Sequence, residues 1–115
     1  MPDTILSSTA RRARETALAV VASAGFPDEV RFTRQLYLAG PGTYIETLRE
    51  LPDACGHAMV VGHNPGMEEL VAALTGVSES MPTAALAVVE LPIESWPDLG
   101  PSPGGSLRST WKPRD

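Results

Sequence analysis

One pattern constrains the fold of this 115-residue chain more than any other feature: a short apolar run, a turn and a helical apolar repeat follow one another twice. The first unit predicts a strand at Thr4–Leu6 and a helix that stops at Gly25. The second predicts a strand at Ala58–Val61, buried on both faces, and a helix that stops at Gly76. The apolar positions that define the two helices are Ala13, Ala17, Val20, Val21 and Ala24, then Met67, Leu70, Val71 and Leu74.

Further elements extend this alternation along the chain. We expect a short strand and a loop over Val30–Leu38, then an amphipathic, peripheral helix that begins at a Thr43–Glu46 capping box and ends near Leu51. Later in the chain we expect a strand at Ala84–Leu91 and, after a loop rich in proline and glycine, a last edge strand at Leu107–Trp111. The sequence therefore predicts a single α/β domain over residues 1–115, with a layered, mostly parallel sheet flanked by helices.

Charge and composition exclude several classes of function. The net charge is -5 and no basic stripe is present that could neutralise a phosphate backbone, so we expect no nucleic-acid partner. No apolar run approaches the roughly 18 residues of a membrane span, so we expect no membrane partner. The single cysteine, Cys55, cannot form an internal disulfide and has no ligand-spaced partner, which favours the cytoplasm and argues against a metal site.

Two segments place polar side chains directly after predicted strands, where open α/β sheets bind ligands. The first segment has Ser8 in an N-cap position, followed by three arginines: Arg11, Arg12 and Arg14. A guanidinium suits phosphate because its planar fork donates two parallel hydrogen bonds and stays charged. Side chains in a first helical turn lean toward the helix N-terminus, which favours Arg12 or Arg11 over Arg14 without choosing between them. The alternative is a solvated basic face that pairs with Glu15.

The second segment leaves the strand Ala58–Val61 with the sequence Gly-His-Asn-Pro-Gly. Gly62 is expected to let the backbone turn sharply, which places His63 immediately past the strand end. Loop residues on a rigid scaffold are favoured functional positions, although a histidine satisfied within a turn is the plainer alternative. His57 and Cys55 precede the strand in a predicted surface turn, and we interpret His57 as structural and Cys55 as incidental.

At these two segments the sequence resembles the histidine phosphatase superfamily, and in particular its SixA-type phosphohistidine phosphatases. Ser8-x-x-x-Arg12-Ala13-x-x-Thr16 is similar to the second-arginine motif of the family, and the run from Val60 to Gly66 is similar to the SixA-type second-histidine motif. The order and separation of the motifs also fit. Four further segments extend the resemblance over nearly the whole chain: Leu36–Ala39, Pro82–Ala85, Trp96 and Pro113–Arg114.

The resemblance implies a phosphatase in which a histidine attacks phosphorus and forms a covalent phosphohistidine that water then hydrolyses. It implies no metal or other cofactor, and its expected substrate is phosphohistidine on a partner protein. Arg12 corresponds to the second phosphate-clamping arginine of the family, and His63 corresponds to its second histidine. Ser8 and Asn64 complete the phosphate-binding set that the resemblance implies.

The chain departs from the family pattern at its beginning. The nucleophilic histidine of the family belongs to an Arg-His-Gly or Arg-His-Ala motif on the first strand, and this sequence contains no Arg-His pair. We therefore expect an N-terminally incomplete histidine phosphatase domain that lacks its first strand and helix, is inactive as it stands, and leaves apolar strand edges unpaired. The acid that protonates a leaving group is not identified, because all three candidates suit surface positions: Glu46, Glu68 and Glu69.

Two other functions remain open from the sequence. One is a non-catalytic module that binds phosphate or a phosphoprotein, which the missing nucleophile favours. The other is a phosphatase of small phosphate esters, because the superfamily is diverse. The sequence predicts no oligomeric state.

Overall fold

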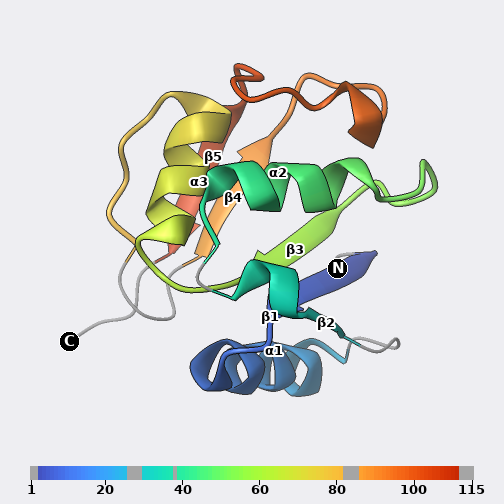
Figure 1. The fold of residues 1–115 in the computed structure, drawn as a ribbon, viewed down its shortest axis with the longest axis vertical. Coiled ribbons are helices and arrows are strands. Elements are labelled where there is room, and N and C mark those ends of the chain that lie inside the picture. Colours follow the sequence, from blue (N-terminus) through green and yellow to red (C-terminus); the bar gives the residue numbers. More distant parts are fainter. Residues whose placement is uncertain (1–2, 26–29, 38, 82–85, 112–115) are drawn as a thin grey trace.

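The computed structural model describes residues 3–25, 30–37, 39–81 and 86–111, which build two small sheets with helices packed against them (Figure 1). A parallel sheet has the strand order β2-β1-β3, and an antiparallel pair joins β4 to β5. The strands are β1 (Thr4–Ser8), β2 (Arg31–Thr33), β3 (Ala58–Val61), β4 (Leu86–Glu90) and β5 (Ser106–Trp111). The prediction of an α/β domain with mostly parallel strands is confirmed.

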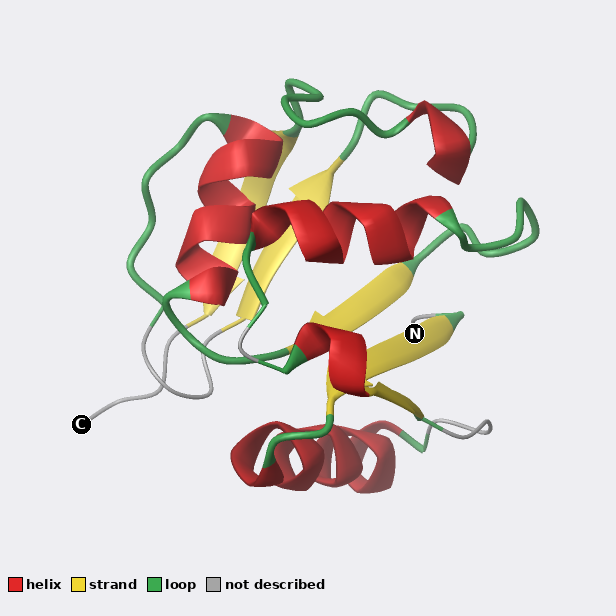
Figure 2. Cartoon of the chain, in the orientation of Figure 1, coloured by secondary structure: helices red, strands yellow, loops and turns green. Residues whose placement is uncertain are grey.

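Among the described residues, three helices cover the sheets; Figure 2 shows how they are arranged. They are α1 (Arg11–Ala24), α2 (Pro41–Arg49) and α3 (Gly66–Thr75), and two 3-10 turns accompany them, η1 (Arg34–Leu36) and η2 (Trp96–Asp98). Neighbouring residues of β1 serve opposite faces of the parallel sheet, because Ile5 packs with Ala13 and Ala17 of α1 whereas Leu6 packs with α2 and α3. The parallel sheet therefore lies between α1 on one face and the α2–α3 layer on the other.

Glycine ends two of the helices, as the sequence predicted. Gly25 follows α1 and Gly76 follows α3, both in the left-handed conformation with φ of 67° and 73°. Each donates its N–H back into the last turn, Gly25 to Val21 and Gly76 to Ala72. Residues with a side chain rarely adopt this conformation, so the two glycines fix where the helices stop.

The predictions for α2 were wrong in two respects. The helix begins at Pro41 with Gly40 as its N-cap, so Thr43 lies inside the first turn and forms no capping box. Proline suits the first helical position, where its fixed φ is already helical and its missing N–H is not needed. The helix is also central rather than peripheral, because three of its side chains are buried in the main core: Tyr44, Ile45 and Leu48.

The strand predictions need smaller corrections. β1 runs on to Ser8, and β3 has the predicted bounds, but only Val61 of β3 is buried while the rest of that strand is half-buried. β5 confirms the predicted last strand, and β4 covers the described part of the predicted strand. Other residues that carried predictions lie outside the described part of the chain: Leu38, Pro82–Ala85 and Pro113–Arg114. Among the described helices, none is long and apolar enough to cross a membrane.

Candidate functional site

The two polar segments singled out in the sequence leave the parallel sheet at the same edge. β1 and β3 are adjacent parallel strands, and their register pairs Ser7 with Val61. The turn that leads to α1 and the loop that begins at Gly62 therefore both start at the carboxyl ends of neighbouring strands. This is the position where α/β sheets commonly bind ligands.

His63 lies in a hollow of about 170 Å³ at this edge. The lining residues are Ala39, Gly40, His63, Asn64, Pro65, Gly66 and Glu69. Gly40 is the N-cap of α2 and Gly66 is the first residue of α3, so the N-termini of two helices border the hollow. Helix N-termini present unpaired N–H groups and a partial positive charge, both of which favour an anion. Sequence reasoning missed the contribution of Gly40, because it placed the start of α2 too late.

Two glycines of the His63 loop are needed because other groups approach them closely. A Cβ at Gly62 would lie 3.0 Å from Cζ of Tyr44 and 3.2 Å from Cε of Met67, and the Tyr44 hydroxyl oxygen is closer still. A Cβ at Gly66 would collide with the backbone carbonyl of Ala39. Neither glycine is among those with positive φ in the described residues, so the expectation that Gly62 provides a conformational turn was wrong. Its role is to let the loop pack against Tyr44.

The side chain of Asn64 ties the loop to two other segments. Its amide group donates to the carbonyl of Met81, and its Oδ1 accepts the N–H of Glu68 at 3.2 Å in the first turn of α3. Glu68 in turn accepts the N–H of Met81 at 2.8 Å. Both polar atoms of Asn64 are therefore engaged with the backbone. Its predicted contact with phosphate stays a prediction, and the structure adds a positioning role that the sequence did not suggest.

Ser8 is also engaged within the protein. The N-cap residue of α1 is Ala10, so the predicted N-cap role of Ser8 was wrong. Ser8 is the last residue of β1 and is fully buried, and its hydroxyl oxygen accepts the N–H of Ala10 at 3.1 Å. This bond stabilises the turn between β1 and α1. The predicted contact between Ser8 and phosphate stays a prediction.

The three arginines of α1 differ in what they contact. Arg11 pairs with Glu15 at 3.1 Å, and both side chains are exposed. The guanidinium of Arg14 lies 4.6 Å from the centre of the Phe32 ring, a cation–π contact. Arg12 has no hydrogen bond, ion pair or ring contact with any residue that the structure describes. Of the three, Arg12 is therefore the one whose guanidinium is available for a ligand.

No family model matches the chain. The uncharacterized proteins Rv1276c of Mycobacterium tuberculosis and ML1117 of Mycobacterium leprae are 34% and 33% identical to it over 110 and 97 residues. The matches cover 86% and 76% of this chain but 66% and 58% of the relatives. The chain thus spans less than two thirds of the length of these relatives.

Two solved structures resemble the chain closely. A proposed phosphohistidine phosphatase SixA from Nakamurella multipartitia matches with a TM-score of 0.81 and 23% identity, over 97% of this chain and 71% of that protein. Its counterpart from Agrobacterium tumefaciens matches with a TM-score of 0.75 and 27% identity, over 99% of this chain and 70% of that protein. The chain has the histidine phosphatase fold. The resemblance found at the two sequence motifs thus extends to the arrangement of strands and helices.

The second histidine of the chain, His57, lies at the opposite end of β3 from His63. The backbone N–H of His57 donates to Asp3 Oδ2 at 3.0 Å, and the N–H of Gly56 donates to the same oxygen at 2.8 Å. These two bonds, that of His57 first, lower the pKa of Asp3 below its ordinary value. β3 is four residues, about 13 Å, long, so His57 is far from the His63 hollow. The structural interpretation of His57 fits these contacts.

Cys55 differs from its prediction. It is buried rather than exposed, with its Sγ 3.5 Å from the carbonyl oxygen of His57. The indole N–H of Trp96 donates to its carbonyl at 2.7 Å and covers this turn. Burial, followed by the charge of Asp3, raises the pKa of the Cys55 thiol. A buried, protonated thiol is inert, so the conclusion that Cys55 has no chemical role keeps its physical basis.

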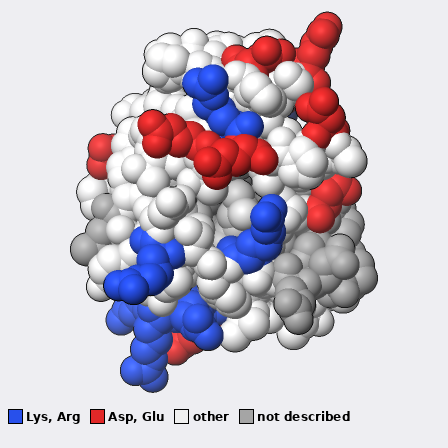
Figure 3. All heavy atoms as spheres, turned by 45° about the vertical axis from the view of Figure 1, so that its right-hand side comes forward, with Lys and Arg blue, Asp and Glu red and all other residues white. Residues whose placement is uncertain are grey.

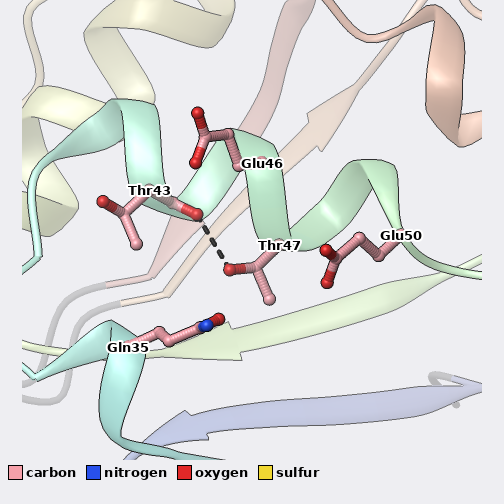
Figure 4. A pocket seen from close by; sticks show the side chains of 5 residues that line it. All are labelled: Gln35, Thr43, Glu46, Thr47 and Glu50. Carbon is pink, nitrogen blue, oxygen red and sulfur yellow. Dashed lines mark hydrogen bonds between the residues drawn. The ribbon is translucent and has the colours of Figure 1, made fainter.

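The three glutamates that the sequence offered as the candidate acid, Glu46, Glu68 and Glu69, lie in different surroundings in the structure. Glu46 lines a different hollow of about 300 Å³, together with Gln35, Thr43, Thr47 and Glu50 (Figure 4). The carboxylate of Glu68 accepts the N–H of Met81. Of the three, Glu69 alone lines the hollow of His63. No cluster of three or more potential metal ligands occurs among the described residues.

Charge is distributed unevenly over the surface. Figure 3 shows most of the cationic side chains in the lower half of the visible face and most of the acidic ones in the upper half. Five exposed arginines belong to α1, β2 and η1: Arg11, Arg12, Arg14, Arg31 and Arg34. An acidic protein with net charge -5 thus carries a basic region beside the turn that follows β1. Such a region attracts anionic ligands over a distance of about one Debye length, about 8–10 Å at ordinary salt.

Proposed function

We propose that the complete protein is a phosphohistidine phosphatase that acts on a phosphorylated protein through a covalent phosphohistidine intermediate. The observation that carries the proposal is the position of His63. It follows β3 in a hollow bordered by the N-termini of α2 and α3, and the free guanidinium of Arg12 belongs to the helix that follows the neighbouring strand. The two solved proteins of the same fold, themselves proposed phosphohistidine phosphatases, support this choice of reaction.

The chemistry assigns a role to each group. A histidine nucleophile forms a bond to phosphorus while the bond from phosphorus to the substrate imidazole breaks, and water then releases inorganic phosphate. Arg12 would donate two parallel hydrogen bonds to the phosphoryl oxygens, and His63 would donate an N–H to a third. Together with the two helix N-termini, these donors would stabilise the charge that spreads over the equatorial oxygens in the transition state.

The nucleophile is the group that these 115 residues do not supply. The chain has two histidines, and the one that is not in the hollow, His57, lies at the far end of β3. We therefore place the attacking histidine in a segment of the whole protein outside these residues, on an Arg-His motif. The 115-residue chain should bind phosphate weakly and should not hydrolyse phosphohistidine.

Turnover of a phosphohistidine peptide tests the proposal. A longer polypeptide that carries the Arg-His motif should release phosphate, and His63→Ala or Arg12→Ala should lower its kcat/KM by two orders of magnitude or more, about 3 kcal/mol. Arg11→Ala is the matched control, because Arg11 already pairs with Glu15. Equal losses for the two arginine variants would remove Arg12 from the site.

Two alternatives are separated by the same assay. A non-catalytic phosphoprotein-binding module is favoured by the distance between His57 and the hollow, and it predicts binding without turnover even in the longer polypeptide. A phosphatase of small phosphate esters predicts that a phosphate monoester is hydrolysed faster than the phosphohistidine peptide. The proposed reaction needs no cofactor, and we assign it to the cytoplasm because Cys55 has no partner for an internal disulfide.

A further inference from the structure

Arg34 follows the end of β2 directly, at the same edge of the parallel sheet as the His63 hollow. β1 and β2 are parallel, and their register pairs Ser8 with Thr33, the last residue of each strand. In the strand order β2-β1-β3, the segments that carry Arg34, Arg12 and His63 therefore leave three adjacent strands at one edge. We call these three residues the edge row.

The backbone at Arg34 is held in place on both sides. At the start of η1, the hydroxyl oxygen of Thr33 accepts the N–H of Gln35 at 3.3 Å. At its end, Leu36 is only 1% exposed, and its carbonyl accepts the hydroxyl of Tyr44 at 3.4 Å. The exposed side chain of Arg34 thus projects from an anchored turn, which is the kind of position where binding residues are found.

The guanidinium of Arg34 is available for a ligand. Its side chain has no hydrogen bond, ion pair or ring contact with any residue that the structure describes. The next residue, Gln35, lines the hollow of Glu46 and Glu50 (Figure 4), but neither carboxylate pairs with Arg34. The edge row of this acidic protein therefore has two uncommitted guanidinium groups, those of Arg12 and Arg34.

The spacing of the edge row separates the tasks of its two arginines. Neighbouring strands lie about 4.8 Å apart, so the ends of β2 and β3, on either side of β1, are about 10 Å apart. An extended chain advances about 3.3 Å per residue, so this distance corresponds to about three residues. When a phosphoryl group is bound at Arg12 and His63, Arg34 is placed to meet a side chain near the phosphorylated residue.

We infer that Arg34 is a docking residue, which binds an acidic side chain of the phosphoprotein about three residues from its phosphohistidine. A guanidinium donates two parallel hydrogen bonds to a carboxylate. The net charge of -5 repels an acidic partner elsewhere, so attraction at the edge row orients that partner toward the hollow. The same net charge disfavours a nucleic acid, which would spread its charge over a larger surface. The inference rests on the proposed function and adds the chemical character of the partner.

Binding of three peptides to the 115-residue chain tests the inference. The first peptide carries a stable phosphonate analogue of phosphohistidine and an aspartate three residues away on either side. In the second, asparagine replaces both aspartates, and in the third, histidine replaces the analogue. The first should bind about threefold to fivefold more tightly than the second, because it alone combines the phosphoryl group with the acidic contact. This preference should shrink as salt is added.

Variants of Arg34 connect the preference to one side chain. Arg34→Ala should remove the preference for aspartate, Arg34→Glu should reverse it, and Arg34→Lys, which keeps the charge, should retain most of it. Arg31→Ala is the matched control, because Arg31 is an exposed arginine at the other end of β2, where it is in register with Leu6. It should keep the preference. Arg34→Ala should unfold at the same urea concentration as the wild-type chain, because its side chain is exposed.

Three results would overturn the inference. One is equal affinity for the first two peptides, and another is an equal loss of preference in Arg34→Ala and Arg31→Ala. The third is an oligonucleotide of the same charge that binds more tightly than the first peptide and depends equally on Arg34. Failure of the proposed function would look different: the first and third peptides would bind equally well, and both would still depend on Arg34.

Discussion

Replacement of Gly62 by alanine tests how the His63 loop is held in place. The new methyl group would lie 3.0 Å from Cζ of Tyr44, and closer to its hydroxyl oxygen. Tyr44 is only 1% exposed, and its hydroxyl donates to the carbonyl of Leu36 at 3.4 Å. The substitution must therefore displace either a buried tyrosine ring or the loop that carries His63.

The magnitude of the Gly62→Ala effect follows from three contributions. Overpacking of a close-packed core costs about 1–3 kcal/mol. Disruption of the tyrosine hydrogen bond adds about 0.5–1.5 kcal/mol. Alanine also lowers the conformational entropy of the unfolded chain, which offsets about 0.4–1 kcal/mol of this loss. We expect the free energy of unfolding to fall by about 0.5–4 kcal/mol.

Urea unfolding of a double-mutant cycle isolates the contact. Tyr44→Phe removes the atom nearest to the new methyl group, so Gly62→Ala should cost at least about 1 kcal/mol less in that background. Gly42→Ala is the matched control, because no atom lies within 4 Å of its Cβ position in α2. It should stabilise the protein by about 0.5–1 kcal/mol. A Gly62→Ala variant as stable as wild type, or an equal cost in both backgrounds, would refute the reasoning.

Three further predictions concern the pH dependence of stability in acid, the His63 loop and the Cys55 thiol. The pKa of Asp3 is lowered from 3.8, so its contribution to stability is present above that pH and is lost as pH falls through the lower folded value; Asp3→Asn should make urea midpoints below pH 4 less pH-dependent. Asn64→Ala removes the side-chain partner of the Met81 carbonyl and of the Glu68 N–H and should lower the free energy of unfolding by about 1–2 kcal/mol; Asn64→Asp, which sets an anionic oxygen against that carbonyl beside Glu68, should recover none of it in the same melts. Cys55 should react with iodoacetamide at pH 8 more slowly than a free cysteine, and a rate equal to that of free cysteine would show that the thiol is not buried.

Local chemistry determined the parts of the fold that the sequence predicted well. Gly25 and Gly76 end α1 and α3 because few other residues adopt the left-handed conformation that both have. The run Ala58–Val61 was recognisable as a strand because it is short, continuously apolar and bounded by turn residues, a pattern typical of a buried strand. Each of these signals is contained within a few neighbouring residues.

The errors concern contacts between residues that are distant in sequence. The residues that neighbour Gly62 in the sequence do not show that Tyr44 packs against it, so Gly62 was interpreted as a turn glycine. Cys55 was placed on the surface because the indole of Trp96, 41 residues later, was not seen to cover its turn. For the candidate site, the sequence proposed His63 and narrowed the arginines to Arg11 and Arg12, and both assignments stay predictions. In the structure, the pairing of Arg11 with Glu15 distinguishes the two arginines.

The central claim is that the hollow at His63 binds phosphate with the help of Arg12. Titration of the 115-residue chain with inorganic phosphate, followed by the NMR signals of its two histidine rings, tests it directly. His57, at the other end of β3, serves as the internal control, and chloride at equal ionic strength corrects for screening. We predict a saturable shift of the His63 signal that is lost in Arg12→Ala and kept in Arg11→Ala, while His57 stays unchanged. Equal shifts of both rings, or no saturable shift of His63, would contradict the account.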